Sequence, residues 1–201
     1  MAESPPIEVR GLTKRYGSTV AVDDLSFAIP PTQITGFLGP NGAGKTTTLR
    51  ALLGLVRPTA GEARVDGEPY RRLREPLRRV GAVLESDSFH PTRSGRNHLR
   101  AQAVAAGIDS ARVDQVLEQV ELSDAAGRRV GGYSLGMRQR LSVAGALLGE
   151  PRLLVLDEPA NGLDPEGIRW LRTFLRSFAA GGGTVFISSH VLSEVQQICS
   201  R

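Results

Sequence analysis

The sequence predicts an α/β domain with a mainly parallel β-sheet, and three observations support this fold class. Residues 153–156 form an apolar run, and residues 184–189 form a similar one. Strands that are apolar on both faces are typical of parallel sheets covered by helices on each side. A third candidate strand, 34–38, leads directly into a glycine-rich loop and a helix. Alternating strands and helices favour a parallel sheet.

The remaining elements are expected in the following order. Short strands at 7–10 and 25–29 would form a mixed edge sheet with a small antiparallel part, and another buried strand is expected at 80–85. The helix after the glycine-rich loop is expected to end near residue 54. Residues 95–148 have strong helical periodicity. One helix within that stretch places four apolar side chains on a single face: Val113, Val116, Leu117 and Val120.

The length of 201 residues suits one sizeable domain with its own core. We expect a single domain over 1–201, with a core formed by about 1–85 and 150–201. The helical stretch at about 86–149 would form a subdomain inserted into that core.

Composition narrows the class of protein. No apolar run approaches the roughly 18 residues that span a bilayer, and the first residues lack the features of a secretory signal. The single cysteine, Cys199, excludes an internal disulfide and fits a reducing cytoplasm.

The net charge is +4, with 23 arginines and only two lysines, Lys14 and Lys45. One dense basic run lies in residues 71–79, with Tyr70 as its only neighbouring aromatic residue. This pattern favours a solvated face over a phosphate or lipid-headgroup patch, and no nucleic-acid partner is expected.

A phosphate-binding loop is the most specific motif of the chain. Gly39-x4-Gly44-Lys45-Thr46 matches the Walker A pattern, with a strand before it and a helix after it. Its glycines let backbone N–H groups cradle phosphates, and the helix N-terminus adds its dipole. Lys45 would bridge the β- and γ-phosphates, and the Thr46 hydroxyl would coordinate Mg²⁺. The residues expected to bind nucleotide here are Gly39, Pro40, Asn41, Gly42, Ala43, Gly44, Lys45, Thr46 and Thr47.

Two acidic residues follow the apolar run at 153–156. Asp157 ends that strand, where a carboxylate can hold Mg²⁺ opposite Thr46. Glu158 follows and is expected to point to the other side of the strand. Paired carboxylates beside a triphosphate suit one metal-side role and one water-activating role.

The segment Tyr133-Ser134-Leu135-Gly136-Met137 resembles the signature motif of the ATP-binding cassette (ABC) family. The resemblance covers nearly the whole chain. It includes Asn161-Gly162-Leu163-Asp164-Pro165, which is similar to the D-loop, and Tyr16 and His190, which match the adenine-stacking aromatic and the switch histidine.

The resemblance implies a site shared by two cassettes. Ser134, expected to cap a helix over 135–148, and Gly136 would face the γ-phosphate of the partner's ATP. Glu158 would be the general base, His190 would contact the γ-phosphate, and Lys45 would complete the catalytic set.

The chain departs from the family pattern at a few positions. Glu85 stands where the Q-loop glutamine is usual; it would still bind Mg²⁺ and is expected to alter coupling without abolishing hydrolysis. Leu135 replaces a glycine of the signature motif, and Met137 stands where glutamine is frequent. The sequence also stops about ten residues beyond His190, which implies either a truncated product or a fold that closes without the family's later strands.

The resemblance implies an ATP- and Mg²⁺-dependent ATPase subunit of a transporter. It would pair with a second cassette, as a homodimer or heterodimer, and would bind an integral membrane permease. Through that permease it would lie peripherally on the cytoplasmic side of the membrane. The residues Val83-Leu84-Glu85 and Tyr133-Ser134-Leu135-Gly136-Met137 further resemble the bacitracin-export branch, which implies efflux of a drug, peptide or lipid-like substrate. Two alternatives stay open: a soluble ABC ATPase without a membrane partner, and a regulatory or low-activity cassette.

Overall fold

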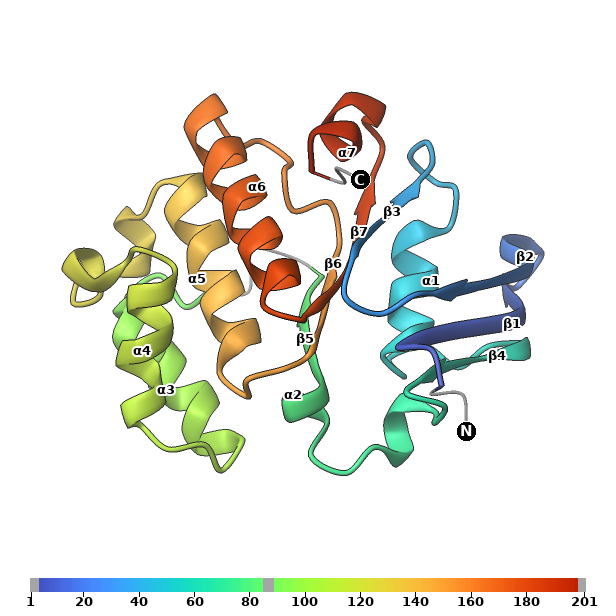
Figure 1. Cartoon of the computed structure of the whole chain (residues 1–201), viewed down its shortest axis with the longest axis horizontal. Coiled ribbons are helices and arrows are strands. Elements are labelled where there is room, and N and C mark those ends of the chain that lie inside the picture. Colours follow the sequence, from blue (N-terminus) through green and yellow to red (C-terminus); the bar gives the residue numbers. More distant parts are fainter. Residues whose placement is uncertain (1–3, 85–88, 199–201) are drawn as a thin grey trace.

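The structure, a computed structural model, describes residues 4–84 and 89–198. Two sheets form its centre. A three-stranded sheet has the order β2-β1-β4, and a four-stranded sheet has the order β3-β7-β6-β5. Figure 1 shows the first sheet at one end of the molecule and the helices α3, α4 and α5 at the other, with the four-stranded sheet between them.

The three-stranded sheet consists of β1 (Ile7–Tyr16), β2 (Thr19–Ile29) and β4 (Ala60–Val65), and both of its strand pairs are antiparallel. The predicted small antiparallel β edge is therefore confirmed, whereas the expectation that these strands belong to a mixed sheet was wrong. β1 and β2 extend well beyond the predicted 7–10 and 25–29 because a two-residue turn joins them into one long hairpin. Register shifts interrupt the pairing along that hairpin, which hides its periodicity in the sequence.

The four-stranded sheet is parallel throughout. It contains β3 (Ile34–Leu38), β5 (Val80–Val83), β6 (Leu153–Leu156) and β7 (Thr184–Ser189). This confirms the mainly parallel α/β fold. Since all four strands run the same way, the residues that follow them meet at one edge of the sheet.

Both faces of β6 are covered, as its apolar run predicted. Leu154 and Leu156 pack into a hydrophobic cluster with the helical part of the chain. Leu153 and Val155 alternate with them and pack into a second cluster, with α1 and the antiparallel sheet. Phe186 of β7 belongs to this second cluster, and its ring lies 5.6 Å from those of Phe27 and Phe37, which ties the two sheets together.

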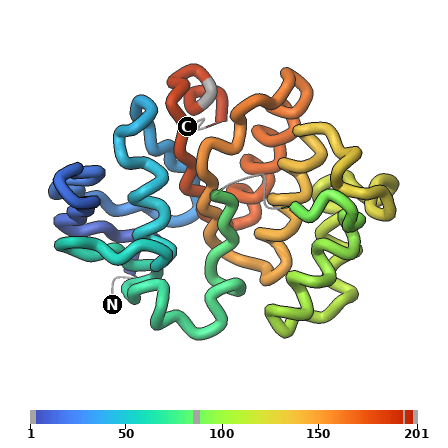
Figure 2. The backbone as a smooth tube through the Cα atoms, turned by 180° about the vertical axis from the view of Figure 1, so that it is seen from behind, coloured from blue at the N-terminus to red at the C-terminus, as the bar shows by residue number. Residues whose placement is uncertain are grey.

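The helices are arranged around these sheets. α1 (Lys45–Leu52) lies between the two sheets, and α6 (Pro165–Ala180) and α7 (Leu192–Ile198) contact the strands β3 and β7. α3 (Gly95–Ala105), α4 (Ala111–Gln119) and α5 (Leu135–Leu147) pack against one another, and α5 also contacts β5. Seen from behind, these three helices again form one group beside the sheet (Figure 2). The exact subdomain boundaries stay a prediction.

Short elements connect the larger ones: the helix α2 (Pro76–Arg79) and the 3₁₀ turns η1 (Tyr70–Arg72), η2 (Ser123–Ala125) and η3 (Val130–Gly132). Across the described residues, none of the helices combines the length and apolar character needed to cross a bilayer.

Candidate nucleotide-binding site

The loop between β3 and α1 has the backbone that phosphate binding requires. Gly42 and Gly44 have φ values of 83° and 85°, in the left-handed region that glycine tolerates. A β-carbon on Gly44 would lie only 2.2 Å from the carbonyl oxygen of Ala21, so no other residue fits there. Gly44 is also the N-cap of α1, and its first turn has no side-chain cap and no acidic residue. The free amides of that turn therefore form an anion site.

Lys45 is buried at the centre of this loop. Its Nζ donates hydrogen bonds to the carbonyl oxygens of Gly39, at 2.6 Å, and Pro40, at 3.0 Å. It also forms an ion pair with Glu158 at 3.2 Å, and only 6% of the lysine side chain is exposed. The ammonium group is thus held over the loop by groups that a phosphate can replace.

Glu158 connects the loop to the end of β7. One carboxylate oxygen pairs with Lys45, and the other lies 2.8 Å from His190 Nδ1. The backbone amide of His190 donates to the same oxygen at 3.3 Å. Sequence reasoning expected Lys45, Glu158 and His190 in one site, and the structure brings all three together.

The pKa of Glu158 reflects these contacts. Burial acts to raise it, but hydrogen bonds from His190 and Lys45, together with the positive charge of Lys45, hold the pKa below its ordinary value. The group is therefore a carboxylate near neutral pH, as a residue that orients or deprotonates water must be.

Asp157 has a different set of contacts. Its Oδ1 accepts a hydrogen bond of 2.5 Å from the hydroxyl of Ser188, and that hydroxyl also accepts from the Glu158 amide at 2.9 Å. Ser188 is completely buried on β7. Sequence reasoning missed Ser188; the only available signal was its position at the end of a strand two residues before His190.

Thr46 and Asp157 each offer an oxygen atom of the kind that binds a magnesium ion. In the described part of the chain, the Thr46 hydroxyl has no protein partner, whereas the Thr48 hydroxyl donates to the Gly44 carbonyl at 2.9 Å. The Asp157 carboxylate has one oxygen bonded to Ser188 and another without a bond among the described residues. A hydroxyl and a carboxylate oxygen are ligands that Mg²⁺ prefers. Glu85, the third predicted metal ligand, lies outside the described residues.

Two other predicted groups lie apart from this cluster. Ser134 caps α5, accepting a hydrogen bond from the Met137 amide at 3.2 Å, as its sequence position predicted. It is exposed, with Gly136 beside it, and α5 and α1 lie on opposite sides of the parallel sheet (Figure 1). Within one chain, Ser134 and Gly136 are therefore not part of the Lys45 cluster.

Tyr16 stands at the end of β1, on the hairpin whose Ala21 contacts Gly44. Its side chain is 49% exposed, and Lys14 Nζ lies 4.8 Å from the ring centroid. The ring is therefore accessible, as stacking on a base would require.

A phosphate loop, a buried lysine and a carboxylate–histidine pair at the edge of a parallel sheet define a nucleoside triphosphate-binding protein. The sequence model of the family described as ABC transporter matches residues 22–161, more than half of the chain. The protein therefore belongs to the ABC transporter family, as one of its ATP-binding cassettes. Tyr16 and His190 lie outside the matched region.

Curated relatives and a solved structure support this assignment. The chain is 47% identical over 195 residues to the bacitracin transport ATP-binding protein BcrA of Bacillus licheniformis, covering 96% of this chain and 64% of that protein. It is 42% identical to the Nod factor export ATP-binding protein I of Burkholderia orbicola, covering 98% of this chain and 66% of that protein. The solved structure of cbiO1 from Clostridium perfringens is 27% identical, with a TM-score of 0.85 over 98% of this chain and 83% of that one. The chain thus spans just under two thirds of the length of these curated relatives.

Proposed function

We propose that this chain binds and hydrolyses ATP to power an export transporter. The observation that carries the proposal is the cluster of Lys45, Glu158 and His190 at the phosphate loop. Ionised Glu158 accepts a proton from, or orients, the attacking water, and Lys45 leaves the carbonyls of Gly39 and Pro40 to bind the phosphates. His190, next to Glu158, contacts the γ-phosphate.

Thr46 and Asp157 would hold Mg²⁺, and when bound it would neutralise charge on the β- and γ-phosphates. Ser188 orients Asp157 through its short hydrogen bond. Tyr16 stacks on the adenine.

The site requires a second cassette. Ser134 and Gly136 lie across the sheet from their own phosphate loop, at the exposed N-terminus of α5. A second cassette facing the first would bring its Ser134, Gly136 and helix dipole to the γ-phosphate bound by Lys45. ATP then closes the pair, and hydrolysis allows it to reopen.

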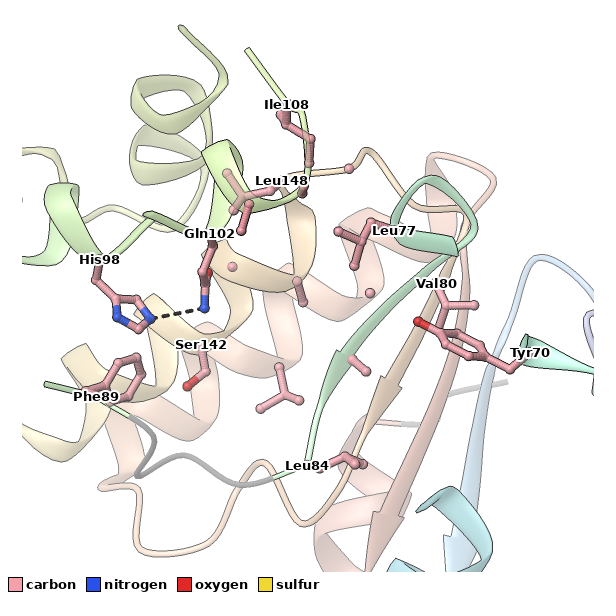
Figure 3. Close-up of a pocket in the computed structure, with 18 residues that line it drawn as sticks. Tyr70, Leu77, Val80, Leu84, Phe89, His98, Gln102, Ile108, Ser142 and Leu148 are labelled. Atoms are coloured by element: carbon pink, nitrogen blue, oxygen red, sulfur yellow. Dashed lines mark hydrogen bonds between the residues drawn. The ribbon is translucent and has the colours of Figure 1, made fainter. Parts of the chain in front are cut away.

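A membrane subunit is the other partner. Beside β5 the structure has a largely apolar cavity of about 480 Å³, lined by strand β5, α3 and α5. Figure 3 shows Leu77, Val80 and Leu148 around it, with the His98–Gln102 hydrogen bond on one wall. We propose that a short segment of the permease binds in this cavity. Binding there would connect the permease to β5, the strand that leads towards Glu85.

The name of one relative supports export as the direction of transport. The relative from Burkholderia orbicola is named as a Nod factor export protein, and BcrA is named as a bacitracin transport protein. We propose a drug-, peptide- or lipid-like cargo, and a peripheral position on the cytoplasmic side of the membrane through the permease.

The replacement Glu158→Gln tests the ATPase proposal. The variant should bind ATP, lose nearly all turnover and accumulate as an ATP-bound dimer, because the amide can neither take a proton nor repel the phosphates. Size-exclusion chromatography with and without ATP measures the dimer, and phosphate release measures turnover. Glu118→Gln, at an exposed position of α4, is the matched control and should behave as wild type. Full turnover in Glu158→Gln would refute the proposed role of Glu158.

A further inference from the structure

Leu135, the residue that replaces a glycine in the signature motif, contacts a distant turn of the same chain. A β-carbon built on Gly162 would lie 2.7 Å from Leu135 Cδ2. The leucine side chain therefore covers the space above Gly162, whose φ of 70° already requires glycine. Leu135 opens α5, and Gly162 belongs to the turn between β6 and α6.

That turn begins at Glu158 and is held at both ends. The Asn161 amide donates to the Glu158 carbonyl at 3.1 Å, and the Leu163 amide donates to the Ala160 carbonyl at 3.1 Å. At its far end, Asp164 caps α6 through the Gly167 amide at 2.7 Å. The Leu135 side chain lies over the middle of the turn, at Gly162, between these two anchors.

We propose that Leu135 is a positioning residue for the ATPase reaction: it holds the 158–164 turn and thereby the Glu158 carboxylate. The proposal rests on the function assigned to Glu158 above. Glu158 has a φ of 48°, a locally unfavourable conformation, and unlike the exposed residues that share it in the described ranges its side chain is partly buried and held by its neighbours. A clamp on the adjoining turn is one such constraint, and it connects the signature helix of a cassette to the catalytic carboxylate of the same cassette.

A competing role for Leu135 is contact with the partner cassette, because 39% of its surface is exposed. The two roles predict different losses. A clamp within the chain affects the rate of hydrolysis at saturating ATP, whereas a partner contact affects the concentration at which the dimer forms.

The first experiment measures both quantities for Leu135→Ala. We expect kcat to fall about tenfold, since small displacements of a reacting group have effects of this size or larger, and KM for ATP to stay within about twofold of wild type. In a Glu158→Gln background, the ATP-dependent dimer should form at the same protein concentration with and without Leu135→Ala. Leu135→Met, which retains the bulk, should restore kcat, and Leu55→Ala, on a side chain 64% exposed, is the control.

The second experiment is a double-variant cycle with Gly162→Ala. The new methyl group would clash with Leu135, so the single variant should lower kcat more than Gly107→Ala, whose φ of 66° is similar but whose β-carbon meets open space. Adding Leu135→Ala removes the clash, and the double variant should lose less activity than the product of the two single effects.

Either of two results for Leu135→Ala would overturn the inference while leaving the proposed function intact: an unchanged kcat, or a lower kcat that higher protein concentration restores. Independent, multiplicative effects in the cycle would do the same. A wild-type chain that hydrolyses no ATP would overturn the proposed function and this inference together.

Discussion

Ser134 and Ser94 form a matched pair that separates a structural role from a role in catalysis. Ser134 caps α5 and Ser94 caps α3, and each hydroxyl accepts a hydrogen bond of 3.2 Å from the amide three residues later. Both residues have extended backbone dihedrals. Removing either hydroxyl leaves one helix amide without its cap, which costs about 1 kcal/mol. For a domain of this size, each alanine variant should lower Tm by about 2–4 °C.

Their effects on ATP turnover should differ. We propose that Ser134 donates to the γ-phosphate of the partner's ATP, and removing one donor from a developing charge typically costs about 100-fold in rate. Ser134→Ala should therefore lose about 100-fold in kcat, and Ser94→Ala should turn over as wild type. Ser134→Asp should keep the cap and the Tm but lose turnover, because its carboxylate repels the phosphate.

Thermal unfolding followed by circular dichroism measures the caps, and steady-state phosphate release at saturating ATP measures turnover. The reasoning is refuted if Ser134→Ala and Ser94→Ala lose equal turnover, since the loss would then follow helix stability. It is also refuted if Ser134→Asp hydrolyses ATP at the wild-type rate.

Two further predictions follow from the geometry. Gly44→Ala should abolish ATP binding, measured by calorimetry, because its methyl group would lie 2.2 Å from the Ala21 carbonyl oxygen; wild-type affinity in that variant would contradict the loop geometry. Burial, aided by the charge of Arg93, holds the pKa of His98 below its ordinary value of 6.5. The folded protein therefore has its full stability from neutral His98 above pH 6.5, and it loses that stability as the pH falls below this value. The free energy of unfolding in urea should thus decrease between pH 7.5 and 5.5, a range of ~2 pH units around the ordinary histidine pKa. The decrease should be smaller in His98→Gln than in wild type or in the exposed control His90→Gln. Equal decreases would contradict this.

The parallel sheet could be predicted because its strands obey a simple rule. Leu153 to Leu156 are buried on both faces, so their burial appears in the sequence as an unbroken apolar run. The sequence of β4 contains no such apolar run. It carries Glu62 and Arg64, which form an ion pair with each other on the exposed face, and only Ala63 and Val65 are buried. Its strand conformation is set by pairing with β1, a contact between distant segments that local sequence does not reveal.

The site could be predicted to a similar extent and for a related reason. Lys45, Asp157, Glu158 and His190 each follow a parallel strand or the loop after one, and the ends of parallel strands meet at one edge. The orientation of each side chain was less accessible. Glu158 was expected on the opposite side of a continuous strand, but β6 ends at Leu156 and the left-handed φ at Glu158 turns its carboxylate towards Lys45.

This backbone conformation sets Glu158 apart from similar residues. Seven non-glycine residues in the described ranges have positive φ, and the other six are exposed, where a turn can adopt the conformation without constraining a side chain. Glu158 alone is partly buried, with 18% of its side chain exposed and both carboxylate oxygens engaged. A locally unfavourable conformation persists where the surroundings over-determine it, and such positions cluster at functional sites. Lys45, His190 and the turn clamped by Leu135 all act on this one residue, so the geometry favours an active hydrolytic cassette over a regulatory one.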